Sequence, residues 1–492
     1  MKATAARGRV DALGIEKNIR WWQYLGDAQG LVVNGLVSGM VGLLTYFYTD
    51  KVGMAAGTAA LAILLAKVFD SFTDLIMGPI VDRTRTRWGK ARPWFLFMAL
   101  PAGVSLPLMF MIPAGAGGAF QFAWAVLTNA FATSVVMTAL MIPYGVLLVY
   151  STRSPAERTA MSIWRAVFSF IAGAIVAIMA VPMANMLGGT QDAWIKLAVI
   201  FGVLATIASL LVFFTARERF DDEGAERQAS DVPYLEGLSF LFRNKHWVLL
   251  LIVNLMASIG YALGGAGGVY YAKWILGDEN LVGLLGAVGF LPFLIGFAII
   301  GPLSKRFGIT NIIRVGLVLA ILASVVRSFN PYSLELTLAT SFFSGLGLVP
   351  MMVSVGVLTS FIAEYNELHF GNNLAGLNAS ATGFGSKLSA GLGAALIGWL
   401  LALGAYDPNL PAQGQGAINA ILAFSIWVPG ALALVELVAL HWFDLEKHYP
   451  SIVGQLAERR AAAQGVVVAS AEGATPVVTA DPAVSDHSDP RP

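Results

Sequence analysis

The chain has 492 residues, of which 57% are hydrophobic and 12% charged, with 52 glycines and a net charge of +1. So apolar a composition excludes an ordinary soluble protein and indicates a polytopic membrane protein. The basic residues are spread over loops, which argues against a nucleic-acid partner, and the lack of cysteine excludes disulfides, thiolate metal sites and cysteine nucleophiles.

The N-terminal segment 1–26 is polar and has no small-residue cleavage site of the kind that ends a signal peptide. Beyond it, apolar stretches recur that reach the length of about 20 helical residues needed to cross a bilayer. The pattern predicts twelve transmembrane helices, at 27–49, 55–81, 93–114, 118–150, 161–187, 193–215, 246–276, 281–303, 312–329, 334–362, 376–404 and 417–441.

A charged segment, 216–245, separates the sixth predicted helix from the seventh. It divides the membrane region into an N-terminal half, 27–215, and a C-terminal half, 246–441. The tail, 442–492, turns to Ala, Val, Ser, Pro and Asp after about residue 460 and is predicted to be mostly disordered. The expected fold is an all-α membrane protein of two six-helix halves.

Lysines and arginines in the short loops predict the orientation. They are concentrated after the second, fourth, sixth and eighth helices, whereas the opposite side holds only Lys51, Lys196, Lys273 and Arg327. By the positive-inside rule, both termini and the central loop lie in the cytoplasm. We therefore expect a multi-pass protein of the cytoplasmic, or inner, membrane, with the lipid bilayer as its surroundings.

A short repeat supports the two halves. Gly78 to Arg83, GPIVDR, ends the second helix, and Gly301 to Arg306, GPLSKR, ends the second helix of the second half. Gly-Pro followed by basic residues is also an ordinary way to end a cytoplasmic helix. Together with the helix count, the repeat indicates a transporter whose substrate cavity lies between the halves.

The second predicted helix carries acid into the bilayer. Asp70 lies near its middle, Asp74 follows one turn later, and Lys67 precedes Asp70 by three residues, so all three share one helix face. Each charge at the bilayer centre costs roughly 2.5–3.5 kcal/mol, so this face must meet protein, water or a bound ion. Carboxylate oxygens suit a hard cation, which predicts a site for a transported cation.

A second interpretation of the same residues is purely structural. Lys67 neutralises Asp70 in a buried pair, and Asp74 binds backbone or hydroxyl groups of a neighbouring helix. The sequence by itself leaves both interpretations open.

Several motifs in chain order resemble one family. They are Gly26-Asp27 followed by FYTDKVG from Phe47, DSFTDLIMGPIVDRTRTRWGKARPW from Asp70, IPYG from Ile142, and SATGFGSKLSAGLGAALIGWLL from Ser380. The chain resembles the glycoside-pentoside-hexuronide cation symporter family of the major facilitator superfamily. The resemblance implies the major facilitator fold and coupled transport of a sugar or glycoside.

The resemblance also implies roles for single residues. Asp70, Asp74 and Thr138 match the family's cation site, and Lys387 matches its helix-eleven lysine, which we expect to pair with one of these acids. Lys67 is assigned with Lys387 to coupling. Met141 stands where the best-known sodium site has an acid, so the coupling cation, Na⁺ or H⁺, stays open.

Substrate residues are predicted in the first, fourth and fifth helices. Asn34 aligns with an acid that contacts the sugar, and Arg165 matches a substrate-binding arginine, although it could also be a helix-end arginine at the interface. Tyr144 and Trp164 can stack on sugar rings, but membrane-interface aromatics have the same composition.

The loop after the second helix suggests a cytoplasmic gate. Asp82, Arg83 and Arg87 lie where that helix meets water, and Glu364 follows the tenth helix. Exposed pairs among them are worth about 0–1 kcal/mol each, which suits a gate that must reopen.

The sequence thus predicts a secondary transporter: a Na⁺- or H⁺-coupled symporter that brings a sugar or glycoside into the cell by alternating access. We expect no cofactor, no metal beyond the transported cation, a small-molecule substrate and a monomeric functional unit. One alternative is a proton-coupled carrier of a non-sugar substrate, including amphiphiles such as lysolipids. A membrane-embedded enzyme is disfavoured by the lack of a clustered metal-ligand His motif or a Gly-x-Ser-x-Gly elbow.

Overall fold

The computed structural model describes residues 11, 15, 17–113, 115–219, 234–370 and 375–463. The helices of the first half are α2 (Trp21–Gly42), α3 (Leu44–Tyr46), η1 (Phe47–Lys51), α4 (Ala56–Arg83), α5 (Arg92–Phe97), α6 (Ala99–Phe110), α7 (Gly118–Ala130), η2 (Phe131–Met137), α8 (Thr138–Ser151), α9 (Pro155–Met186) and α10 (Gln191–Thr215). The three η segments of the described chain are π-helical turns inside longer helices.

The second half has the same plan. Its helices are α11 (Tyr234–Arg243), α12 (Lys245–Trp274), α13 (Leu281–Phe307), α14 (Ile309–Phe329), α15 (Leu334–Phe370), α16 (Ala375–Leu403), α17 (Gln415–Leu422), η3 (Ala423–Trp427), α18 (Val428–His441) and α19 (Leu445–Ala463). Both copies of the repeated motif fall in the last turns of corresponding helices, α4 and α13.

Within the described residues, eleven helical runs are long and apolar enough to cross a membrane. The remaining predicted span, 93–114, is formed by α5 and α6, which are interrupted at Met98. Pro101 explains the interruption, because it has no N–H to donate to the carbonyl of Phe97 and its ring crowds that carbonyl. The prediction of an all-α multi-pass membrane protein is confirmed.

Two helices lie outside the predicted spans. α11 forms in the central loop, and α19 forms in the tail that we expected to be mostly disordered. α19 is stabilised because Ile452 and Leu456, one turn apart, bury their side chains where α19 packs against α15. The segments 220–233 and 464–492 lie outside the described residues, so the predicted disorder of the last part of the tail stays a prediction.

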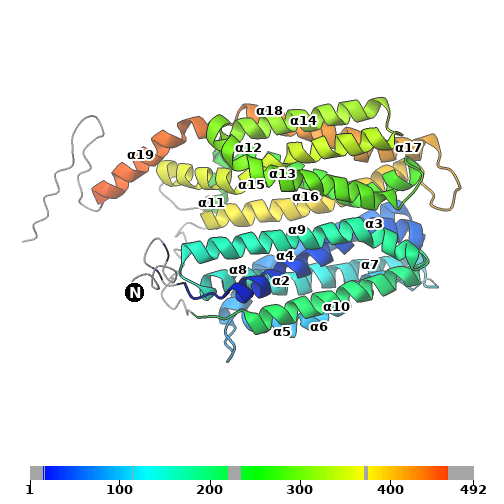
Figure 1. Ribbon diagram of the computed structural model, residues 1–492, viewed down its shortest axis with the longest axis horizontal. Helices are drawn as coiled ribbons and strands as arrows, with labels where there is room; N and C mark the ends of the chain where they lie inside the picture. Colours follow the sequence, from blue (N-terminus) through cyan, green and yellow to red (C-terminus); the bar gives the residue numbers. More distant parts are fainter. Residues whose placement is uncertain are drawn as a thin grey trace, which may run out of the picture.

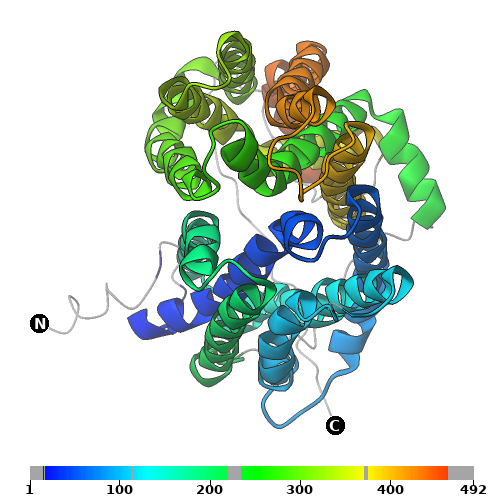
Figure 2. The same ribbon diagram turned by 90° about the vertical axis from the view of Figure 1, so that its right-hand side faces the viewer.

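The two halves form separate groups of helices. Figure 1 shows the helices side by side, with the start of α2, α11 and α19 toward one end and α3 and α17 toward the other. Seen end-on in Figure 2, the blue-to-green first half and the green-to-orange second half face each other. α4 packs against α16, and α9 packs against α13, so these two helix pairs join the halves.

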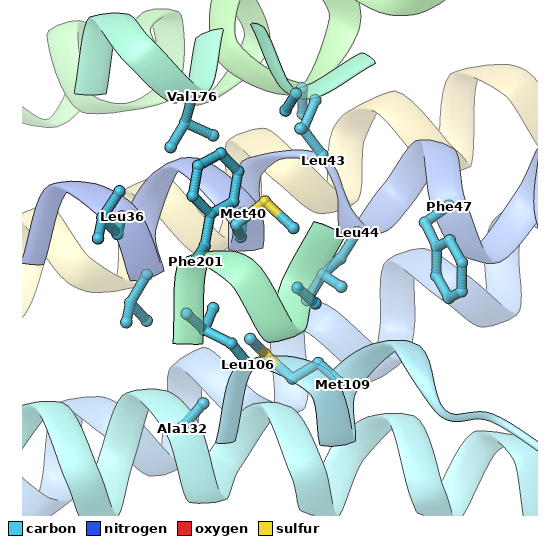
Figure 3. Packing of buried hydrophobic residues seen from close by; sticks show 14 of the residues in the cluster. Leu36, Met40, Leu43, Leu44, Phe47, Leu106, Met109, Ala132, Val176 and Phe201 are labelled. Atoms are coloured by element: carbon cyan, nitrogen blue, oxygen red, sulfur yellow. The ribbon is translucent and has the colours of Figure 1, made fainter. Parts of the chain in front are cut away.

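The helices of the first half pack around buried apolar side chains. In the first half α2 is wedged between α9 and α10, and Figure 3 shows Met40 of α2 close to Phe201 of α10 and Val176 of α9. All three side chains are buried. These contacts hold α2, α9 and α10 of the first half together as one packed unit.

Candidate functional site

The acidic pair of α4 lies against α16 of the other half. Nζ of Lys387 is 3.1 Å from Oδ1 of Asp70 and 2.7 Å from Oδ2 of Asp74, so one ammonium group bridges both carboxylates. The Asp70 side chain is buried, whereas those of Asp74 and Lys387 are each about one-third exposed. The predicted cation-binding acids and the predicted coupling lysine are therefore brought together at one place.

A second lysine completes this cluster. Nζ of Lys67 lies 3.4 Å from the other oxygen of Asp70. Two carboxylates and two ammonium groups therefore balance, which lowers the cost of holding Asp70 in a buried position. The contact between Lys67 and Asp70 also belongs to the structural interpretation, so it does not separate the two interpretations.

Thr138 supplies an oxygen to the same cluster. The Thr138 hydroxyl donates a hydrogen bond of 2.9 Å to Oδ1 of Asp74. The hydroxyl of Thr73 lies 3.4 Å from the Thr138 hydroxyl. Thr138 begins α8 directly after the π-helical turn η2. Such turns shift the register of the residues that follow and are frequent at functional sites. Here the turn precedes the residue that reaches across to α4.

A glycine allows α16 to come this close to α4. A Cβ atom at Gly391 would lie 2.7 Å from Cβ of Lys67, closer than two side chains can approach. One turn before it on α16, Lys387 reaches Asp70 and Asp74. On the other side of the cluster, the rings of Phe72 and Phe384 meet edge to face at 5.9 Å.

This arrangement makes the charge of two acids control a contact between halves. A cation or proton that binds Asp70 or Asp74 competes with Lys387 for the same oxygens. Because Lys387 belongs to the second half, its release weakens the link between α4 and α16. A cation or proton at either acid would therefore alter the charge balance at a contact between α4 and α16.

Arg165 does not face this cluster. It is buried, and its Nε and Nη2 donate to the two oxygens of Asp27 at 2.6 and 2.8 Å. Its Nη1 donates to the carbonyl of Tyr144, and its guanidinium lies 3.6 Å from the centre of the Tyr144 ring. Since the Tyr144 hydroxyl donates to the carbonyl of Asp27, these residues tie α2, α8 and α9 together within one half.

The sequence did not identify Asp27 as the partner of Arg165, although Gly26-Asp27 was one of the matched motifs. The predicted substrate contacts of Arg165 and Tyr144 stay predictions. In this structure the Arg165 guanidinium and the Tyr144 hydroxyl both donate hydrogen bonds to Asp27. Asn34 is half-buried on α2, where it accepts a 3.5 Å hydrogen bond from Ser38, and Trp164 is exposed on α9 beside Phe168. Of these four residues, Arg165 and Tyr144 contact each other, and the contacts described for Asn34 and Trp164 are with Ser38 and Phe168.

Among described residues, hydrogen bonds and ion pairs between the halves also gather at the end that holds η1 and α17. Lys273 of α12 lies 2.6 Å from Asp50, whose side chain is fully buried, and Tyr406 donates to the same carboxylate at 2.8 Å. The hydroxyls of Thr49 and Tyr270 are 2.7 Å apart. This end is opposite the basic loops and is predicted to face outward.

Further bonds at the same end involve the loop between α12 and α13 of the second half. Glu279 accepts a hydrogen bond from Tyr46 and lies 3.7 Å from Nζ of Lys51. Asn185 at the end of α9 donates to Asn280 at 2.9 Å. The first half therefore closes on the second at this end.

The predicted cytoplasmic gate is not assembled here. Arg83 is exposed and Arg87 lies over the ring of Trp88, while Glu364 hydrogen-bonds Tyr449 of α19 in its own half. Burial, followed by this hydrogen bond, raises the pKa of Tyr449. The side chain of Asp82 lies outside the described part of the chain. A gate that closes in another state stays a prediction.

The loop between α4 and α5 is held in place by a residue that the sequence did not single out. The carboxylate of Glu218 accepts hydrogen bonds of 2.7–2.8 Å from the backbone N–H groups of Lys90, Ala91 and Arg92. Gly89 has φ +111°, and a Cβ there would lie 2.3 Å from the carboxyl group of Glu218. The Trp-Gly-Lys motif therefore has a structural cause.

Comparison with known proteins decides the family. The family model described as MFS/sugar transport protein matches residues 29–447. The chain belongs to this family. Its predicted resemblance to cation symporters of glycosides is confirmed by curated relatives of nearly full length.

One of these relatives is the inner membrane symporter YicJ of Escherichia coli (strain K12), 28% identical, with 92% of this chain and 96% of the relative covered. Another is the isoprimeverose transporter of Lactiplantibacillus pentosus, also 28% identical, with 85% and 87% covered. A third is the putative glycoside/cation symporter YagG of Escherichia coli (strain K12), 27% identical over 87% of this chain and 93% of the relative.

Solved structures agree on the fold. The nucleoside transporter NupG matches with a TM-score of 0.60 at 14% identity, covering 86% of this chain and 100% of that chain. A bacterial homolog of the human lysosomal transporter Spinster, inward-facing and occupied, matches with a TM-score of 0.61 at 14% identity, covering 87% and 96%. The protein is therefore a major facilitator transporter of a small molecule and, as predicted, not an enzyme.

Proposed function

We propose that this transporter is a cation-coupled symporter that moves a sugar or glycoside into the cell. The observation that carries the proposal is the ammonium of Lys387, which bridges Asp70 and Asp74 across the two halves. A transported Na⁺ or H⁺ takes the place of Lys387 at these carboxylates, and Thr138 adds a hydroxyl oxygen. The names of the relatives, a glycoside/cation symporter and an isoprimeverose transporter, support the substrate class.

Coupling follows from linkage. If the bound cation raises the affinity for substrate, the substrate raises the affinity for the cation by the same factor. Release of Lys387 by the cation is the physical step that connects the cation site with the contact between α4 and α16. The two halves then rock about this contact, and both termini lie in the cytoplasm.

Uptake into proteoliposomes tests the proposal. Sodium and proton gradients are imposed separately, and accumulation is measured for radiolabelled pentosides, hexosides, disaccharides and uronides. We expect one gradient to drive accumulation of at least one sugar, and Asp74→Asn to abolish that dependence. Asp192→Asn is the matched control, because Asp192 is an exposed acid on the first turn of α10. Sugar accumulation that is the same with and without a sodium or proton gradient contradicts the proposal.

Alternating access has its own test, because the chain has no cysteine to interfere with labelling. The Leu64 side chain of α4 approaches α16 near Gly391, and it precedes Asp70 by six residues, toward the end of α4 that is predicted to face outward. In a Leu64→Cys variant, we expect Lys273→Gln to increase labelling by an impermeant maleimide added outside, because Asp50 loses its ion pair. Equal labelling with and without Lys273→Gln would exclude Asp50–Lys273 as an outer closure.

The alternative, a proton-coupled carrier of a non-sugar substrate, rests on one observation. Asn34 and Met141 occupy positions where the resembling family has sugar-binding acids, and both are half-buried side chains of the first half. Accumulation of a lysolipid under a proton gradient, with no uptake of any sugar, would favour this alternative.

A further inference from the structure

A cavity of about 690 Å³ lies on the second half at the end predicted to be cytoplasmic. Three elements form it: Phe242 and Arg243 at the end of α11, Lys245 at the start of α12, and Trp442 directly after α18. The transport mechanism uses none of these residues, and the cavity is remote in sequence from the acidic cluster of α4. Its lining therefore calls for a separate explanation.

One part of the cavity is apolar and continuous with the membrane-facing surface. Val248 and Leu249 line it from the first turns of a membrane span. The side chains of Phe242 and Trp442 are each 61% exposed, as aromatic residues at a membrane boundary often are. Val438, four residues before Trp442, is an exposed apolar side chain of α18. This part suits an acyl chain.

The other part of the cavity is positively charged. Arg243 is exposed and has no ion pair to any residue in the described ranges, whereas Lys245 lies 3.3 Å from Asp444. Asp444 is further engaged by His246, whose Nε2 lies 3.5 Å from it. Two fixed cations facing one carboxylate leave a surplus of one positive charge, and His441 at the rim adds another when it is protonated.

We propose that this cavity binds an anionic phospholipid of the surrounding bilayer. The phosphodiester of a lipid such as phosphatidylglycerol carries one negative charge, which matches the surplus beside Arg243 and Lys245. Basic pockets at the cytoplasmic boundary of membrane helices recognise such headgroups. A free phosphate ion would match the charge but would leave Val248, Leu249 and the two aromatic side chains without a partner.

The bound lipid would connect α11 to the junction of α12 and α18. α11 is the described helix of the segment that links the two halves. It buries Leu241 while exposing Phe242 and Arg243, as an amphipathic helix at a membrane surface does. The lipid therefore fixes the linker to the second half, and this role does not depend on the identity of the transported substrate.

Native mass spectrometry of the full-length delipidated protein tests the site. The protein is titrated with phosphatidylglycerol, with phosphatidylcholine and with inorganic phosphate. We expect a tight phosphatidylglycerol adduct on the wild type, and about fivefold weaker binding for Arg243→Gln, which corresponds to one basic contact. Arg306→Gln is the matched control, because Arg306 is an exposed arginine at the end of α13 outside the cavity.

A second variant keeps the test sharp if Arg243→Gln folds poorly. Trp442→Ala removes the exposed aromatic wall without changing any charge, and we expect it to weaken phosphatidylglycerol binding with an unchanged unfolding temperature. Equal phosphatidylglycerol binding by the wild type and both variants would overturn the proposal. So would equal binding of phosphatidylcholine, or displacement of the lipid by millimolar inorganic phosphate.

Discussion

The ion pair of Asp27 with Arg165 and the ion pairs of Lys387 with Asp70 and Asp74 use the same chemical groups in different settings. The first is buried and lies within one half, and the arginine donates two parallel hydrogen bonds to one carboxylate. The second joins the two halves, and its lysine is about one-third exposed.

This difference indicates how a transporter separates structure from function. A bidentate arginine pair that is closed to water has no competitor for its carboxylate, so it holds α2 and α9 in a fixed relation. A lysine shared by two acids at a partly exposed place can be displaced by a small cation. Under the proposed function, the two sets of ion pairs differ in role because one lies within a half and the other joins the two halves.

The largest effect is expected from Asp70→Asn. The amide removes the negative charge that faces both Lys387 and Lys67. Each charge-assisted hydrogen bond is worth about 1.5–3 kcal/mol, so we expect cation-driven accumulation to fall by about 100-fold or more. Uptake in proteoliposomes with and without the driving gradient measures this. Wild-type dependence on the cation would show that the cluster is a structural ion pair after all.

The fixed pair is expected to respond in stability instead. Arg165→Gln leaves the carboxylate of Asp27 buried and unpaired, which costs about 3–5 kcal/mol. The unfolding temperature of the purified protein should therefore fall. The double variant Asp27→Asn with Arg165→Gln should recover much of the loss, because no buried charge remains. If Arg165→Gln keeps the wild-type unfolding temperature but loses substrate binding, Arg165 is a substrate ligand.

Lys387→Met sharpens the comparison further. Removal of the ammonium leaves Asp74 without a lysine partner and Asp70 with Lys67 alone, so we expect the apparent cation affinity to rise by about tenfold. Substrate accumulation should fall, because the ion pairs that connect the cation site on α4 with α16 of the other half are lost. Cation titrations by calorimetry and parallel uptake assays measure the two effects. Lys305→Met, at an exposed position of α13, is the control.

The smallest effect is expected from Thr138→Val, which keeps the shape of the side chain but removes its hydroxyl. The lost hydrogen bond to Asp74 should weaken cation binding by about fivefold. Thr133→Val is the matched control, because that hydroxyl donates to the carbonyl of Asn129 in its own helix. An equal effect of both substitutions would remove Thr138 from the cation site.

Much of the fold could be predicted from the sequence, because a long apolar run, a Gly-Pro ending and a cluster of basic loop residues are local signals. Some helix limits agree closely, as for α4, expected at 55–81 and found at Ala56–Arg83, whereas α9 begins six residues earlier than expected and α15 ends eight residues later. α19 escaped prediction because its composition is polar and its helix is stabilised by packing on α15. The break at Met98 was not predicted, because hydropathy does not reveal that Pro101 lacks the N–H needed to continue the helix.

The sequence by itself determined that this chain crosses the membrane in two similar halves and that Asp70, Asp74 and Lys67 share one helix face, because helical periodicity acts over a few residues. The family resemblance predicted that Lys387 pairs with Asp70 or Asp74, and the structure shows it bound to both. Only the tertiary structure decided the other partners: Arg165 meets Asp27 across 138 residues, and Lys273 meets Asp50 across 223. Local patterns carry no information about which helix faces which. Those partners depend on how the helices pack, because a buried charge is stable only when packing places an oppositely charged group beside it.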